Sequence, residues 1–144
     1  MKIILHSTIQ RYEGEYVSLS AFMLSPSPRI GDKEEVHLAG AGSFKGGVSD
    51  FLLSYTENET EQKVSLLYKD GVLRFSHGKT VADFVPGKLT AFSHEMGYGV
   101  IEQTVYTESV TVKEREGKYL VSLVYLAHFS GMVQKNKMMW KIET

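Results

Sequence analysis

The chain of 144 residues contains no cysteine. Disulfide bonds, thiolate nucleophiles and thiolate metal ligands are therefore excluded. The absence fits a reducing compartment. The first residues, from Met1 to His6, read as a strand rather than as the apolar core of a signal peptide. We therefore expect a cytoplasmic protein.

An excess of charge of either sign is also missing, because 16 Lys and Arg stand against 17 Asp and Glu. No segment is basic enough to attract nucleic acid or an anionic membrane surface. No apolar run approaches the roughly 20 residues that a transmembrane helix needs. We therefore expect neither a nucleic-acid partner nor a membrane partner.

Proline is scarce, with three in the chain, and apolar residues alternate along most of it. The clearest alternation covers residues 119–129 and resumes at Met138, Trp140 and Ile142. A period of two is typical of strands. Similar runs include residues 2–9, 16–24 and 34–44, and Pro26 and Pro28 predict a surface loop at residues 25–33.

Turn residues separate these runs at short intervals. The pair Asp70-Gly71 suits a two-residue hairpin, and Pro86-Gly87 predicts another turn. No segment shows the period of a helix, so parallel βαβ units are disfavoured. The sequence therefore predicts one all-β domain over residues 1–144, with about eight to ten strands that meander in a single antiparallel barrel. Closing the barrel would pair an N-terminal strand with a C-terminal one.

The order of features resembles a known family. It runs from Gly42-Ser43-Phe44-Lys45 through the aromatic strand 51–57 and the Asp70-Gly71 hairpin to Gly97-Tyr98-Gly99 and the long closing strands. This is similar to the YwiB-like family of uncharacterised bacterial proteins, found mainly in Firmicutes, over residues 1–9 and 42–144. The resemblance implies a calycin-like β-barrel, related in shape to lipocalins and streptavidin. It implies no activity, because the family has none established.

A small barrel can hold one small ligand, and aromatic side chains would line it. The chain has eight Tyr, seven Phe and one Trp for this purpose. The alternative, which small barrels favour, is that these side chains fill the interior. The candidate ligand-binding residues are Phe51, Tyr55, Tyr98, Glu102, Tyr106, Tyr125 and Trp140.

Metal and acid–base chemistry have weaker signals. The five histidines show no ligand spacing, although neighbouring strands could bring His6 and His128 together. Asp83 and Glu102 are the candidate acid–base carboxylates, each flanked by apolar residues. Glu102 would act so only if its face of the strand points inward, where desolvation raises the pKa of a carboxyl group. We expect no metal, no cofactor and no catalytic residue.

Three functions are consistent with these patterns, and an enzyme with Glu102 or Asp83 as general acid or base is the weakest of them. The first is non-catalytic binding of a small apolar or amphipathic ligand in the barrel. The second is a protein-interaction module or homo-oligomer with a packed barrel. Apolar residues on both faces of segments 16–24 and 119–129 motivate the second.

Overall fold

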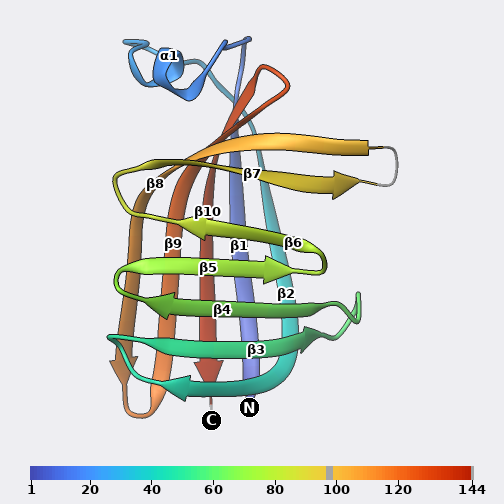
Figure 1. The fold of residues 1–144 in the computed structure, drawn as a ribbon, viewed down its shortest axis with the longest axis vertical. Coiled ribbons are helices and arrows are strands. Elements are labelled where there is room, and N and C mark those ends of the chain that lie inside the picture. The colour runs from blue at the N-terminus through green and yellow to red at the C-terminus, as the bar shows by residue number, and fades with distance from the viewer. Residues whose placement is uncertain (97–98, 144) are drawn as a thin grey trace.

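The computed structural model describes residues 1–96 and 99–143, and ten strands and one short helix lie in these residues (Figure 1). They are β1 (Lys2–Tyr12), α1 (Leu19–Met23), β2 (Ile30–Gly46), β3 (Phe51–Glu57), β4 (Lys63–Lys69), β5 (Val72–His77), β6 (Thr80–Phe84), β7 (Leu89–Met96), β8 (Gly99–Arg115), β9 (Lys118–Phe129) and β10 (Met132–Glu143). The predicted all-β, antiparallel barrel is confirmed. No helix in these residues is long and apolar enough to cross a bilayer.

The ten strands form one antiparallel sheet in the order β6-β5-β4-β3-β2-β1-β10-β9-β8-β7. β1 pairs with β10 from Lys2 opposite Glu143 to Arg11 opposite Gln134, as closure of the barrel requires. The two edge strands, β6 and β7, meet at a seam. There the hydroxyl of Thr90 donates to the carbonyl oxygen of Asp83 at 2.9 Å, and the barrel is nearly closed.

Two 17-residue strands, β2 and β8, turn the corners of the barrel. The first part of β2 pairs with β1 and its last part, from Gly40, pairs with β3. Figure 1 shows the result: β3 to β6 run across the front, and β1, β9 and β10 stand behind them at a steep angle. Gly40 and Gly42 lie where β2 approaches β3. A Cβ at Gly42 would overlap the carbonyl oxygen of Ser54.

The half of the barrel nearer the two chain termini is filled by its own side chains. Trp140 and Leu53 are completely buried there, together with Val121 and Leu123. Their cluster also contains Ile3, Leu5, Phe51, Tyr55, Val64, Leu66, Leu73, Ala82, Phe84, Val105, Ala127 and Ile142. This core results from the alternation, since every second residue of each strand points inward.

The prediction of a strand over residues 16–24 is wrong, because α1 occupies this segment. Ser18 caps the helix, and its hydroxyl oxygen accepts from the backbone N–H of Ala21 at 3.1 Å. Leu19 and Phe22, one helical turn apart, are buried against Leu126 and Val133 on the outer face of the sheet. The apolar residues on both faces of β9 are thus explained near Leu126, which α1 covers.

Other boundaries differ less. The loop predicted at residues 25–33 is shorter, because β2 already begins at Ile30. The hairpin at Asp70-Gly71 is confirmed, with positive φ angles of 53° and 78° as a type I′ turn requires.

We expect Gly42→Ala to lower the free energy of unfolding by about 1–3 kcal/mol, the usual cost of overpacking. The added methyl group would lie 2.5 Å from the Cα of Tyr55, and backbone cannot move aside as a flexible side chain can. Urea denaturation measures the change. Gly47→Ala is the control, because a Cβ there meets nothing within 4 Å. Equal stability of the two variants would contradict the close approach of β2 to β3.

Candidate functional site

Three polar residues form one row on the inner face of the barrel. Thr107 of β8 lies opposite Tyr125 of β9, and Tyr125 lies opposite Asn136 of β10. A bulge at β8, between Thr107 and Ser109, follows the first residue of the row. We call Thr107, Tyr125 and Asn136 the inner polar row. It lies between the packed half of the barrel and the end that carries α1.

Two atoms of the inner polar row have no hydrogen-bond partner among the described residues. They are Oγ1 of Thr107 and Nδ2 of Asn136, in side chains that are 0% and 3% exposed. The other amide atom of Asn136, Oδ1, accepts from Nε2 of Gln134 at 3.2 Å. An unsatisfied buried polar group costs about 1–3 kcal/mol. Two unsatisfied atoms in one row indicate that a polar group of a bound molecule, or ordered water, is their hydrogen-bond partner.

Tyr125 stands between these two residues. Burial raises the pKa of its hydroxyl to about 12, so the group stays protonated and can donate a hydrogen bond at neutral pH. Its ring packs on Phe84, with centroids 4.6 Å apart. The side chain still keeps part of its surface accessible although it points inward. Neighbouring side chains therefore do not cover Tyr125 completely.

A cavity of about 450 Å³ lies at the α1 end, beyond Gln134. It is lined by Arg11, Tyr12, Glu13, Gly31, Asp32, Phe129, Met132, Val133 and Gln134. The guanidinium group of Arg11 is paired with Asp32 and Glu34, each at 2.9 Å. Gln134 connects this cavity to the inner polar row through its bond to Asn136.

A second polar cluster lies at the end of β3. Glu57 is 2% exposed, and Nε2 of His77 donates to its carboxylate at 2.7 Å. The hydroxyl of Thr60 donates to the same oxygen at 3.2 Å. Nearby in β3, the hydroxyl of Tyr55 accepts from Nε1 of Trp140 at 3.0 Å. Burial is the main reason that the pKa of Tyr55 rises to about 12.

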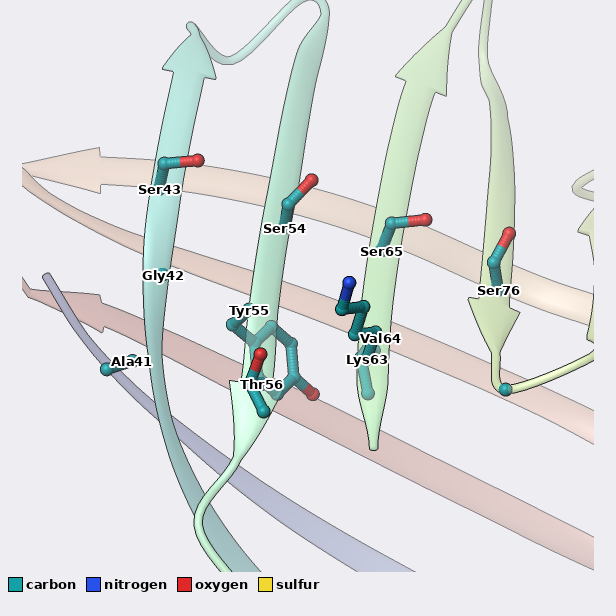
Figure 2. A pocket seen from close by; sticks show the side chains of 11 residues that line it. Ala41, Gly42, Ser43, Ser54, Tyr55, Thr56, Lys63, Val64, Ser65 and Ser76 are labelled. Atoms are coloured by element: carbon teal, nitrogen blue, oxygen red, sulfur yellow. The ribbon is translucent and has the colours of Figure 1, made fainter. Parts of the chain in front are cut away.

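A shallow groove of about 620 Å³ crosses the outer face of β2 to β5 (Figure 2). Ser43, Ser54, Ser65 and Ser76 follow one another across the four strands, each opposite the next. Their side chains remain accessible to water, which can satisfy the hydroxyl groups. Among the described residues, the groove therefore contains no unsatisfied polar group that would indicate a ligand, whereas the inner polar row contains two.

The residues predicted to bind a ligand do not all come together. Phe51, Tyr55 and Trp140 lie inside the packed half, and Tyr125 lies in the inner polar row. Tyr106 lies on the outer face beside α1, and Glu102 is exposed on that same face. Tyr98 is outside the described residues. Glu102 is therefore an ordinary solvated strand residue.

The other candidate acid–base residue, Asp83, forms an ion pair with Arg74 on the surface. Its carboxylate accepts from Nε and Nη2 of Arg74 at 2.8 and 3.1 Å, and these bonds lower the pKa of Asp83. His6 and His128, which adjacent strands could have brought together, are separated because β10 lies between their strands. Nε2 of His128 instead donates to the carbonyl oxygen of Tyr16 at 2.7 Å, which holds the segment before α1.

Sequence reasoning missed Thr107, Asn136 and Glu57. Alternation contained a signal for two of them, since Glu57 shares parity with Leu53 and Tyr55, and Asn136 shares parity with Trp140. Thr107 carried a weaker signal, because the bulge after it changes the parity of β8.

Comparisons with known proteins agree with this fold. A family described as "Domain of unknown function (DUF1934)" matches residues 27–139. The crystal structure of the YwiB protein from Bacillus subtilis matches with a TM-score of 0.59 and 18% sequence identity, and the match covers 99% of this chain and 92% of that one. No curated protein sequence matches the chain. The predicted resemblance to the YwiB-like family is confirmed.

We expect Tyr125 to make the folded state less stable as the pH rises from about 10 to about 12. Below pH 10 the phenol is neutral in both states, whereas between these values it ionises only in the unfolded chain. Tyr125→Phe should therefore flatten the decline of unfolding free energy over this range, as urea titrations at each pH measure. It should also remove one phenol from the ultraviolet absorbance titration near pH 12. Loss of a phenol that ionises near pH 10, with the absorbance change near pH 12 intact, would show instead that Tyr125 is in contact with bulk water.

Proposed function

The chain belongs to the DUF1934 family of domains of unknown function, and from its geometry we propose that the barrel binds one small amphipathic molecule in the half nearer α1. The observation that carries the proposal is the pair of unpartnered buried atoms that flank Tyr125. Packed side chains around Trp140 exclude the other half of the barrel, so the ligand is small.

The inner polar row defines the polar end of this molecule. Nδ2 of Asn136 and the hydroxyls of Thr107 and Tyr125 can all donate hydrogen bonds. No lysine or arginine belongs to the row, and the nearby Arg11 is already paired with two carboxylates. Donors without a cation suit a neutral acceptor, such as a carbonyl or hydroxyl oxygen, better than a carboxylate or a phosphate.

Apolar side chains supply the rest of the site. Phe84 packs on Tyr125, and Ile9 of β1 lies opposite Asn136. The cavity beyond Gln134, with Phe129 and Met132 in its wall, gives a direction of approach from the α1 end. Its volume of about 450 Å³ falls within the range of roughly 300–1,000 Å³ that is usual for small-ligand sites.

Binding is favoured over catalysis because the buried carboxylate is committed elsewhere. Glu57 bonds to His77 and Thr60, and it belongs to β3 rather than to the three strands of the inner polar row. A ligand held by uncharged donors and aromatic walls requires no acid–base group.

The test compares Asn136→Leu with the unchanged protein, using the uncharged fluorescent dye Nile red, which carries a carbonyl acceptor, as a probe. We expect saturable binding by the unchanged protein and little by the variant, because the leucine removes the unpartnered donor and narrows the site. Urea denaturation should find the variant at least as stable as the unchanged chain, since an unsatisfied group is removed.

Asn58→Leu makes the same change on the surface and should leave dye binding intact. Unchanged binding by Asn136→Leu, together with a loss of stability above about 1 kcal/mol, would mean that Asn136 has a structural water partner. That result would overturn the proposal. Native mass spectrometry of the protein isolated from cells, compared with its denatured mass, would identify a retained ligand.

Self-association is the second candidate function, and an apolar surface around α1 favours it. Val17 and Leu24 are 90% and 84% exposed, and Met23 and Leu89 are about half exposed. Met23, Leu24 and Leu89 border a groove of about 380 Å³ beside Tyr106. A second copy of the chain would cover these side chains.

Sedimentation velocity tests this second candidate. If the surface around α1 joins two copies, the unchanged chain sediments as a dimer and Leu24→Glu as a monomer, because the interface cannot desolvate an unpaired carboxylate. Val81→Glu is the control, since Val81 is 51% exposed on β6. A monomer of the unchanged chain at high concentration would exclude self-association.

A further inference from the structure

Three metal-ligating side chains meet on the outer face of β1 and β2. His6 of β1 lies opposite His37 of β2, and their rings stack with centroids 4.2 Å apart at an angle of 18°. Glu35 lies two residues before His37, on the same face of β2. One donor atom from each of His6, Glu35 and His37 lies within 4.8 Å of the other two.

The state of His6 is a second observation that points to a ligand. Its Nε2 is buried and has no hydrogen-bond partner in the part of the chain that the structure describes. Glu35 and His37 are exposed, so a cation from solvent can reach the cluster. Nζ of Lys33 lies 3.9 Å from Oε1 of Glu35, and both side chains are more than half exposed, so this pair is weak.

We infer that His6, Glu35 and His37 form a binding site for a borderline divalent cation such as Zn²⁺. Two imidazole nitrogens and one carboxylate oxygen are a donor set that zinc accepts, with water in the fourth position. Tetrahedral zinc ligands lie roughly 3.3 Å apart, given bonds of about 2.0–2.1 Å. Rotation of the exposed side chains of Glu35 and His37 can shorten the distances between the three donor atoms from within 4.8 Å to about 3.3 Å.

The position of this site gives it a structural consequence. β1 and β2 are joined through the segment that contains α1, between Tyr12 and Ile30. A metal bound by His6 and His37 would cross-link β1 and β2 within their paired region, away from this connecting segment. A cation that binds only the folded chain stabilises it by mass action. The inference is independent of a ligand inside the barrel, because the three side chains lie on the outer face.

The first experiment is isothermal titration of Zn²⁺ into protein treated with EDTA and then desalted. We expect one ion per chain. His37→Ala and Glu35→Gln should each weaken binding at least about 10-fold, because even outer-shell partners of a metal contribute 10- to 100-fold. Both altered residues are exposed, so the variants should fold.

Two controls and a second readout accompany the titration. Glu114→Gln removes an exposed carboxylate from β8 and should bind Zn²⁺ as the unchanged chain does. Lys33→Ala removes the cation that competes for Glu35 and should bind at least as tightly. Zn²⁺ should raise the thermal unfolding midpoint of the unchanged chain and of both controls, but not that of His37→Ala. Absence of binding, or equal binding by His37→Ala, would overturn the inference.

Discussion

The pairing of β1 with β10 is the constraint on which the rest of this structure depends. It joins residues from opposite ends of the chain over ten registered pairs. Without it, both strands would become exposed edges, and the inward residues of β9 and β2 would lose their common interior. Contacts between residues so distant in sequence are slow to form, because the loop between them must first close. The register of this pairing also sets which side chains face inward on the neighbouring strands.

Closure leaves an interior whose two halves differ in chemistry. Around Trp140 the side chains are apolar and buried, and the two polar atoms that meet there, Nε1 of Trp140 and the Tyr55 hydroxyl, bond to each other. Around Tyr125 the sheet instead buries one amide nitrogen and one hydroxyl for which the described residues provide no partner. A fold that needed only stability would have apolar residues at Thr107 and Asn136, since partly satisfied polar groups weaken a core. Their presence is the physical reason that we propose a binding role for this half.

The outer face is covered in part by the chain itself. α1 closes over Leu126 and Val133, and His128 anchors the segment before the helix through the carbonyl oxygen of Tyr16. Near α1, the apolar residues on the outer face of β9 are therefore covered by the helix of the same chain and do not require a partner. Val17, just before α1, and Leu24, just after it, are exposed and form an apolar surface beside the helix.

Alternation and turn residues were sufficient to predict the all-β class, most strands, the antiparallel barrel and the hairpin at Asp70-Gly71, because these depend on neighbours in sequence. The segment 16–24 was misread, since its apolar residues suit either a strand or a short capped helix and only packing against β9 and β10 decides. Of the candidate ligand-binding residues, Tyr125 lies in the inner polar row, whereas Tyr106 and Glu102 lie outside the barrel. The meeting of Thr107 with Asn136, and of His6 with His37, was decided by the tertiary structure alone. Which residues face each other across a sheet depends on strand order, register and the bulge in β8, and these are set by contacts between distant parts of the chain.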